Sequence, residues 1–251
     1  MPFVGSPFPI GSPRCALRVG LSAARTLAVL ALVLAPFGPA HSAPPAGYYD
    51  SVNTSSAGAL RASLHDVIDD HHRFPYTSSA TDTWDILENA DENPADAAAI
   101  LDVYMNASFP KNGGGGGGYN REHTWPSSWF GGGSPMKSDL FHVRPTDGYV
   151  NNRRGNRPYG LVLNARWTST NGSKVGPSHQ CGYAREVFEP RDEFKGDLAR
   201  GMFYMATRYR GEDADWSTSD ATERAPLEPW AEELLKVWHI EDPVDDRELA
   251  R

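Results

Sequence analysis

The first 43 residues of the chain differ in composition from everything after them, and this difference fixes how much chain is left to fold. They carry three arginines and no acidic residue, an apolar run from Leu27 to Leu34, and small residues that end at Ser42 or Ala43. This order is typical of a secretory signal peptide. The apolar run is too short to span a bilayer, which takes roughly 20 apolar residues. We therefore expect a leader at residues 1–43 and a mature protein that is secreted or periplasmic and has no membrane anchor.

Removal of that leader leaves 208 residues, enough for one domain with a substantial core and too few for two. Of the two cysteines, Cys15 lies in the leader, so Cys181 has no partner within the remaining chain. No intrachain disulfide is then possible, and the stability must come from packing. We expect a single monomeric domain at residues 44–251, in which Cys181 is a structural thiol rather than a reactive one.

The charge of the remaining chain is unevenly distributed. Without the leader, 21 lysines and arginines stand against 32 acidic residues, a net charge of −11 that should repel nucleic acid. Residues 121–160 reverse that sign, with six basic side chains against three acidic ones. A local patch of this kind can bind a phosphate chain while the acidic remainder keeps the protein soluble. A solvated run of surface charges is the alternative interpretation of the same residues.

Apolar residues recur at helical spacing in three segments, as they do along the buried face of a helix. Ser56 can cap the first segment, and the segment that follows Pro190 aligns Phe194, Leu198 and two methionines on one face. A further stretch, before the glycine run, is a helical candidate as well. The four expected helices cover residues 57–71, 95–106, 190–209 and 226–238.

The middle of the chain predicts a different local order. A glycine run at residues 113–118 has no side chains with which to build a core, so we expect a flexible loop there. Two strand-like segments follow, 119–130 and 138–145, separated by a glycine-rich turn. Thr146 or Asp147 can then cap a short helix that the next glycine ends. The expected order is strand, long loop, strand and short helix.

Arg121, Glu122 and His123 place a guanidinium, a carboxylate and an imidazole side by side on the first of these strands. A neutral imidazole can take a proton from water near neutral pH. A carboxylate can hold a hard cation that stabilises the charge building up on a phosphate. The triplet alone is weak evidence. Residues 138–156 add oxygen donors and further cations, and the two segments together supply the parts that a phosphodiester hydrolase needs.

These segments resemble the bacterial endonuclease I family, which are nonspecific nucleases with a ββα-metal, or His-Me finger, active site. The resemblance runs through most of the chain after the leader, including residues 47–87, 119–160 and 187–209 in the same order. It implies an α+β fold, a single mixed domain in which a ββα-metal nuclease core is surrounded by helices. Many relatives carry a histidine where this chain has Phe141, and some carry disulfides that it cannot form.

The resemblance also implies a role for the residues of the motifs. His123 would be the general base, and Glu122 and Asn151 would hold one Mg²⁺, or another divalent cation such as Mn²⁺ or Ca²⁺, with waters completing its coordination. Glu122 and His123 would face opposite ways in an ideal strand, so we expect a distorted backbone there. Asp139 and His142 are expected to orient the site through hydrogen bonds.

Four arginines and an asparagine complete the expected site. Arg144 is a candidate catalytic residue. Arg121, Arg153, Arg154 and Asn156 are candidate contacts to the nucleic acid. For Arg144, Arg153 and Arg154 an alternative is equally open, namely that they brace the helix through ion pairs.

The predicted function is that of a secreted, metal-dependent, nonspecific endonuclease that hydrolyses the phosphodiester bonds of DNA and, we expect, of RNA. Two alternatives are open: a catalytically inactive relative that only binds nucleic acid, and an extracellular ribonuclease with little activity on DNA. Retention of a base argues against the first, since binding alone needs none. Hydrolysis directed at the backbone reads no bases, so the sequence leaves the choice between DNA and RNA open.

Overall fold

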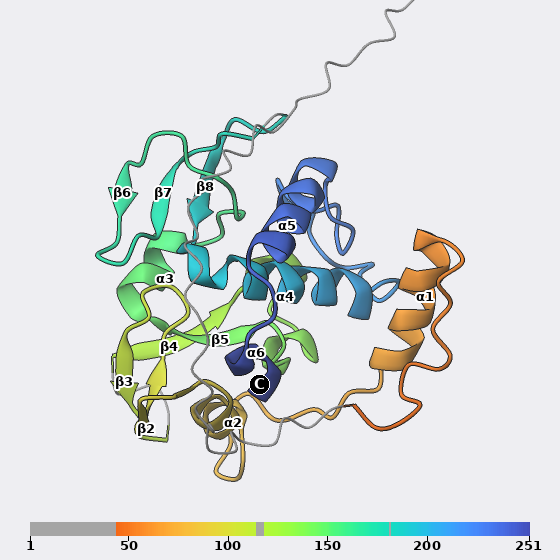
Figure 1. Cartoon of the computed structure of the whole chain (residues 1–251), viewed down its shortest axis with the longest axis horizontal. Coiled ribbons are helices and arrows are strands. Elements are labelled where there is room, and N and C mark those ends of the chain that lie inside the picture. The colour runs from red at the N-terminus through yellow and green to blue at the C-terminus, as the bar shows by residue number, and fades with distance from the viewer. Residues whose placement is uncertain (1–43, 114–117, 181) are drawn as a thin grey trace, which may run out of the picture. The chain divides into compact units, whose positions relative to one another are not determined.

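The structure of the chain is a computed structural model in which helices and three small antiparallel sheets are mixed within the described residues (Figure 1). This is the α+β fold that the sequence predicts. From residue 44 onward the chain belongs to one compact unit. None of the helices in the described residues is long and apolar enough to cross a membrane. The expected leader, most of the glycine run and Cys181 lie outside the described residues, which are 44–113, 118–180 and 182–251.

The regular elements are short, and each sheet joins strands that follow one another in the sequence. The helices are α1 (Ala57–Ile68), α2 (Thr83–Ala90), α3 (Gly148–Arg154), α4 (Lys195–Arg208), α5 (Pro229–Glu241) and α6 (Asp246–Ala250). One sheet holds β1 (Glu92–Asn93), β2 (Asp96–Leu101) and β3 (Ser108–Pro110). A second holds β4 (Tyr119–His123) and β5 (Val143–Asp147). The third holds β6 (Trp167–Thr168), β7 (Lys174–Pro177) and β8 (Glu186–Glu189). Three single turns of 3-10 helix lie at Ser127–Phe130, Met136–Ser138 and Asp192–Phe194.

Helix α1 lies where the sequence predicts a helix, although it ends at Ile68 rather than at residue 71. Ser56 caps it as expected, because its Oγ accepts a hydrogen bond from the Ala59 N–H at 3.1 Å. His65 joins α1 to α4, since its Nδ1 donates to the carbonyl oxygen of Arg208 at 3.0 Å. The side chains of α1 are all at least partly exposed, so the helix lies against α4 without entering the core.

The helix expected at residues 95–106 is wrong, because β2 occupies the first half of this segment. Ile100 pairs with Glu92 of β1 on one side and with β3 on the other, so β2 is the central strand of its sheet. Backbone pairing along both edges outweighs the helical tendency of three consecutive alanines. Beyond the strand, Asp102 accepts a hydrogen bond from the Tyr104 N–H at 2.9 Å, and this turn brings Tyr104 into the core.

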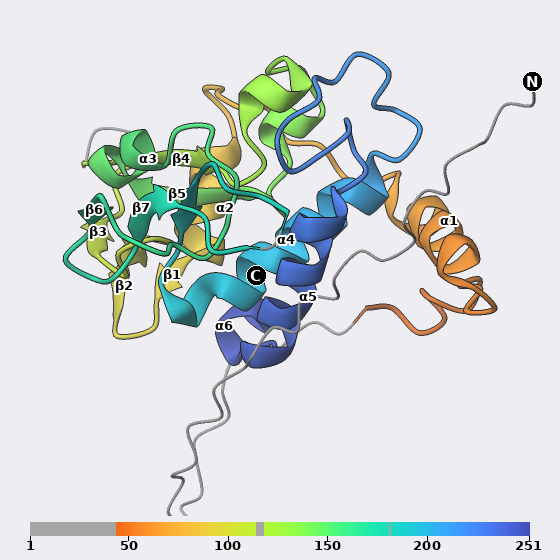
Figure 2. The same ribbon diagram turned by 90° about the horizontal axis from the view of Figure 1, so that it is seen from above.

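Helices α4 and α5 supply much of the hydrophobic core, and both lie where the sequence predicts them (Figure 2). The two helices pack against each other. α4 buries the leucine and methionines of its predicted face, and Phe194 is buried just before it. α5 begins with Pro229, which suits the first turn because the N–H groups there have no helical partner. Trp238 of α5 is 1% exposed and lies in the same core.

Helix α2, helix α6 and the sheet of β6, β7 and β8 have no counterpart in the prediction from sequence. α2 opens with a reciprocal cap: Asp82 accepts from the Trp84 N–H at 2.7 Å, and Asp85 accepts from the Asp82 N–H at 2.9 Å. α6 lies in the acidic segment after α5 and is capped by Asp245. Strands as short as two residues, such as β6, carry too little alternation to be recognised from their sequence.

Candidate active site

Strands β4 and β5 and helix α3 form the strand, loop, strand and short helix that the sequence predicts (Figure 1). Every residue of β4 pairs with β5, from Tyr119 opposite Asp147 to His123 opposite Val143. Asp147, the second of the two expected caps, begins α3, because its Oδ1 accepts from two backbone N–H groups of the first turn at 2.9 Å each. The two strands and the helix therefore form one continuous ββα unit.

The irregularity expected between Glu122 and His123 does not occur within β4, whose pairing with β5 runs unbroken from residue 119 to residue 123. The two side chains leave the strand on opposite faces, as alternation requires. Glu122 is 3% exposed and contacts Arg154 of α3, whereas the ring of His123 is stacked on Tyr76. β4 ends at His123, so this side chain lies at the end of the strand.

Glu122 is the buried carboxylate at the centre of a polar cluster. Its Oε1 lies 3.0 Å from Nη1 of Arg154 and accepts a hydrogen bond of 2.6 Å from the Tyr104 hydroxyl. Tyr104 in turn shares a hydrogen bond of 2.7 Å with the hydroxyl of Tyr159. Burial raises the pKa of Glu122, while the ion pair with Arg154 and the bond from Tyr104 act to lower it. Both contacts fall on Oε1, so Oε2 is the oxygen through which this carboxylate could bind a cation.

Asn151 of α3 lies over the same face of β4 as Glu122. Its Nδ2 donates to Oδ1 of Asn120 at 2.8 Å. Asn120 and Glu122 are two positions apart in β4 and so share a face, and Asn151 and Arg154 are three positions apart on α3 and so share a side. Pairing through Asn120 commits the amide nitrogen of Asn151, and its carbonyl oxygen is the remaining ligand atom.

His123 is held in one tautomer. Its Nε2 lies 2.9 Å from the backbone carbonyl oxygen of Lys137, and because a carbonyl only accepts, Nε2 carries the proton. Nδ1 is then the nitrogen with a lone pair. The ring lies among Tyr76, Phe130 and His142, with centroid distances of 5.7, 5.9 and 5.5 Å. Burial and then the neighbouring His142 lower the pKa of His123 to about 3, so the imidazole is neutral near pH 7.

Asp139 and His142 anchor the loop between the two strands. Oδ2 of Asp139 accepts hydrogen bonds from the hydroxyls of Tyr204 and Tyr209 at 3.0 and 2.7 Å. The side chain of His142 is fully buried, and its Nε2 donates to the Met136 carbonyl oxygen at 2.7 Å. These bonds fix the loop whose carbonyl group holds His123, which agrees with the orienting role expected from the sequence.

Arg154 has a bracing role in the structure instead of the phosphate contact that was one interpretation of the sequence. The residue is 1% exposed. Its Nη1 lies 3.0 Å from the carbonyl oxygen of His123, and its Nη2 donates to that of Thr124 at 2.6 Å. Together with the ion pair to Glu122, these bonds tie α3 to the end of β4. A guanidinium buried in this way has almost no surface for a phosphate, and this placement favours the alternative of an internal brace.

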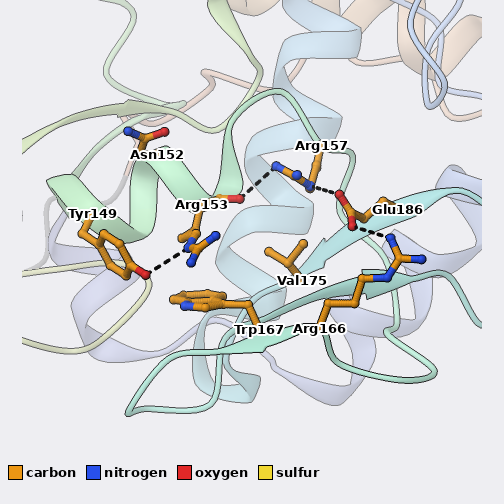
Figure 3. Close-up of a pocket in the computed structure, with 8 residues that line it drawn as sticks. All are labelled: Tyr149, Asn152, Arg153, Arg157, Arg166, Trp167, Val175 and Glu186. Atoms are coloured by element: carbon orange, nitrogen blue, oxygen red, sulfur yellow. Dashed lines mark hydrogen bonds and ion pairs between the residues drawn. The ribbon is translucent and has the colours of Figure 1, made fainter.

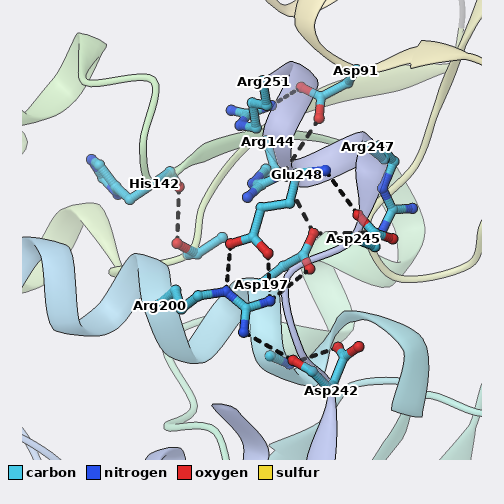
Figure 4. Close-up of polar contacts among 12 residues, drawn as sticks. Asp91, His142, Arg144, Asp197, Arg200, Asp242, Asp245, Arg247, Glu248 and Arg251 are labelled. Carbon is cyan, nitrogen blue, oxygen red and sulfur yellow. Dashed lines mark hydrogen bonds and ion pairs between the residues drawn. The ribbon is translucent and has the colours of Figure 1, made fainter. Parts of the chain in front are cut away.

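Arg144, expected to be catalytic, lies inside a buried cluster of charged side chains (Figure 4). Its Nη1 is 3.5 Å from Oδ1 of Asp91 and 3.9 Å from Oδ2 of Asp197. Arg251 joins the cluster by pairing with Asp91 and donates to the carbonyl oxygen of Val143 at 2.6 Å. Arg144 is thus surrounded by protein carboxylates at 6% exposure, and this placement gives it a structural role in holding β5.

Of the remaining expected contacts to nucleic acid, Arg121 is held by aromatic rings, whereas Arg153 and Asn156 are exposed. The guanidinium carbon of Arg121 lies 3.4 Å from the ring centroid of Tyr76 and 4.1 Å from that of Trp84. Contacts of this kind fix the guanidinium in place. The exposed pair, Arg153 and Asn156, is therefore better placed than Arg121 to reach a phosphate chain.

The oxygen atoms between β4 and α3 suit a hard divalent cation. Glu122 and Asn151 offer a carboxylate and an amide oxygen, which are ligand types that Mg²⁺, Mn²⁺ and Ca²⁺ accept. In the part of the chain that the structure describes, no group of three or more His, Cys, Asp or Glu side chains could hold a metal ion. A cation bound at this place would therefore have few protein ligands and keep several waters, as Mg²⁺ commonly does.

Reasoning from the sequence missed two members of this site. Tyr104 falls in the segment wrongly predicted to be helical, and its position depends on the turn after β2, for which no local pattern gives a signal. Asn120 had a signal, because a residue two positions before Glu122 in a strand lies on the same face. Its amide oxygen is what orients Asn151.

Comparison with known proteins points to one family. Residues 56–251 match a family model described as Endonuclease I. Two similar proteins are both named extracellular ribonuclease. The one from Bacillus subtilis (strain 168) is 35% identical over 212 residues, which cover 81% of this chain and 69% of that protein. The one from Bacillus amyloliquefaciens is 36% identical over 218 residues, which cover 84% of this chain and 71% of that protein.

Proposed function

The chain belongs to the endonuclease I family, and we propose on that premise that it is a secreted, metal-dependent endonuclease cleaving RNA and DNA without sequence specificity. As a member of this family it is a nuclease that acts on phosphodiester bonds. Two observations support secretion: the composition of residues 1–43, and the word extracellular in the names of both similar proteins. We also propose which residue acts as the base, which residues bind the cation and which substrates are cleaved.

The observation that carries the proposal is the tautomer of His123. With Nε2 bonded to the Lys137 carbonyl oxygen, Nδ1 is the nitrogen that can take a proton from an attacking water. The water oxygen then forms a bond to phosphorus while the bond to the leaving oxygen breaks, and the leaving oxygen takes up a proton from solvent. The low pKa of His123 keeps the ring neutral before substrate binds. The negative charge of a bound phosphodiester raises that pKa, because an opposite charge favours the protonated imidazole, and the base becomes stronger where it is needed.

Glu122 and Asn151 are the residues that we propose as ligands of the cation. A divalent ion bound there would stabilise the negative charge that builds up on the phosphate and on the leaving oxygen. Neighbouring residues fix both ligands before a cation binds. Tyr104 and Arg154 hold Oε1 of Glu122, and Asn120 holds the amide nitrogen of Asn151. Ligands fixed in this way lose little conformational entropy when a cation binds.

Exposed groups on and after α3 are proposed to position the substrate through its phosphates. Arg153 and Asn156 lie on the surface of the ββα unit, whereas Arg144 and Arg154 are buried. Contacts to phosphates position a nucleic acid without reading its bases, which accounts for cleavage independent of sequence.

An extracellular ribonuclease with little activity on DNA is the second candidate, and the names of the two similar proteins favour it. A relative that only binds nucleic acid is disfavoured, because the bonded and neutral His123 has the arrangement of a base and binding needs none.

A matched digestion tests the proposed function. Single-stranded DNA, double-stranded DNA and RNA of equal length would each be incubated with the protein in Mg²⁺, Mn²⁺, Ca²⁺ or a chelator. We expect cleavage of both RNA and DNA in at least one divalent cation and none in the chelator. Cleavage of RNA alone would establish the second candidate, and failure to cleave any of the three in every cation would refute the proposal.

A further inference from the structure

A cleft beside α3 gathers aromatic and arginine side chains that the proposed mechanism does not use (Figure 3). Its volume is about 370 Å³. Sites for small molecules range from about 300 to 1,000 Å³, so the cleft is large enough for one small planar group. Its walls come from α3 on one side and from the sheet of β6, β7 and β8 on the other.

Two aromatic rings, inclined at 66° to each other, line this cleft. Tyr149 of α3 is 59% exposed, and its ring centroid lies 6.1 Å from that of Trp167 in β6. Trp167 is partly buried and packs against the core, so its ring is held in a fixed orientation. Exposed aromatic rings on a rigid support are the surfaces on which unstacked bases of a single strand are bound.

Arg153 lies between these rings, as Figure 3 shows. Its guanidinium carbon is 5.3 Å from the Tyr149 ring centroid and 5.7 Å from that of Trp167. Its Nε donates to the Tyr149 hydroxyl at 3.0 Å. Within the described residues it has no carboxylate partner, so its guanidinium can turn to a phosphate or stack on an entering base.

The charge around the cleft favours an anion. Three arginines line it against a single carboxylate, Glu186. Arg157 and Arg166 pair with the two oxygens of Glu186 at 2.7 and 3.1 Å. The side chain of Arg166 is 71% exposed, so it reaches solvent beyond this pair. Arg157, Arg166 and Glu186 together carry one net positive charge, and Arg153 adds a second.

The cleft is adjacent to the proposed catalytic unit. Tyr149, Asn152 and Arg153 all belong to α3, the helix that carries Asn151. A helix rises about 1.5 Å per residue, so these residues lie within roughly one turn of the proposed metal ligand along the helix axis. Tyr149 and Arg153 are each two positions from Asn151 and so project from the other side of α3, and a strand bound in the cleft would pass around α3 to bring another of its phosphates to Asn151.

We propose that this cleft binds an unstacked base of a single-stranded nucleic acid, on the side of α3 away from Asn151, while the same strand continues to the phosphate that is cleaved. The base stacks on the face of Trp167 and meets Tyr149 at its edge, because the two rings are inclined at 66° to each other. Arg153 and Arg166 contact the flanking phosphates. This inference rests on the proposed function and names the form of substrate that the site prefers. Bases of a duplex are already paired and stacked, so a duplex cannot fill the cleft without opening, whereas a single strand of either RNA or DNA can.

The test uses the inactive variant His123→Ala as parent, so that strands stay intact during measurement. Fluorescence anisotropy would compare its affinity for a labelled single-stranded thymidine decamer with that for a decamer of abasic residues, which keeps the phosphates and lacks the bases. Stacking on an aromatic side chain contributes roughly 5- to 150-fold in affinity per base. We expect the parent to prefer the base-bearing strand by at least about fivefold, and Trp167→Leu to abolish that preference while affinity for the abasic strand is unchanged.

Two further variants separate stacking from folding and from charge. Tyr149→Leu alters a side chain that is 59% exposed, and it should reduce the same preference without affecting the fold. Arg166→Ala should weaken binding of both strands alike. Its matched control is Arg185→Ala, which also removes an exposed arginine, 2.8 Å from Asp220 and outside the cleft, and which should change neither affinity.

The outcomes test the base site separately from the nuclease activity. If Trp167→Leu and Tyr149→Leu are folded and both keep the parent's preference, or if the parent has none, the base site is refuted. Digestion by the unmodified protein is read separately. If the unmodified protein cleaves nucleic acid but His123→Ala shows no base preference, the proposed function is supported and the base site is refuted. If the base preference depends on Trp167 but the unmodified protein cleaves nothing, the base site is supported and the proposed function is refuted.

Discussion

Replacement of Arg154 by methionine tests the arrangement of the ββα unit most severely, because it removes the charge while keeping most of the packing volume. Arg154 is 1% exposed and bonds Glu122 and two backbone carbonyl groups at the end of β4. Removing one partner of a buried ion pair leaves the other charge uncompensated and typically costs about 3–5 kcal/mol. In a domain of 150–250 residues each kcal/mol lowers Tm by about 2–4 °C, so we expect a loss of roughly 6–20 °C.

The assay is urea unfolding followed by tryptophan fluorescence, with thermal unfolding by circular dichroism as a second probe. Arg153→Met is the matched control, because it alters the neighbouring, exposed arginine of the same helix and should cost less than about 1 kcal/mol. Adding Glu122→Gln to Arg154→Met removes the carboxylate that Arg154 no longer neutralises, so the double variant should be more stable than Arg154→Met alone. If Arg154→Met costs less than 1 kcal/mol and instead lowers the salt dependence of DNA binding, Arg154 contacts phosphate and its placement here is incorrect.

Three further predictions concern the cation, the loop and the substrate. Glu122→Ala and Asn151→Ala should each weaken Mg²⁺ binding in calorimetry while the exposed control Asn156→Ala does not; unchanged affinity in both would show that the ligands are wrong. Burial lowers the pKa of His142 from 6.5, so the unfolded chain takes up this proton first as the pH falls. The contribution of the neutral side chain is thus complete above pH 6.5 and lost below it, and His142→Leu should cost more stability at pH 7.5 than at pH 5.5; an equal cost at both would contradict the assignment. Arg153 is the one cationic phosphate contact proposed for a duplex, since the neutral Asn156 releases no counterion, so the logarithm of the affinity of His123→Ala for duplex DNA should fall with the logarithm of salt at a slope of roughly −1, and a slope of roughly −4 in anisotropy titrations would show that more basic residues take part.

The parts of the fold that the sequence predicted are those specified within a few neighbouring residues. The cap at Asp147 and the helical face of α4 depend on local spacing, and so does the order of strand, loop, strand and helix. The alanines of β2 favour a helix, and the pairing with β1 and β3 that makes the segment a strand comes from outside it.

The candidate site shows the same division. The motif placed Glu122 and His123 on β4 and Asn151 on α3, since these positions follow from the chain order. The sequence did not show which arginines face solvent. Arg154 bonds groups about thirty positions earlier, and Arg144 bonds Asp91 and Asp197 from distant parts of the chain. Contacts of that range are decided by tertiary packing, and no local pattern reports them.

The role of His123 as general base is tested by the single-turnover rate of RNA and DNA cleavage in Mg²⁺ for the unmodified protein, His123→Ala and the surface control Arg185→Ala. Loss of a general base typically lowers the rate by roughly 10² to 10⁴. We expect a loss of that size for His123→Ala in a protein that stays folded by circular dichroism, a rate within about twofold of normal for Arg185→Ala, and no cleavage by any of the three in chelator. Cleavage by His123→Ala at a rate near that of the unmodified protein would show that another group takes the proton and that His123 is not the base.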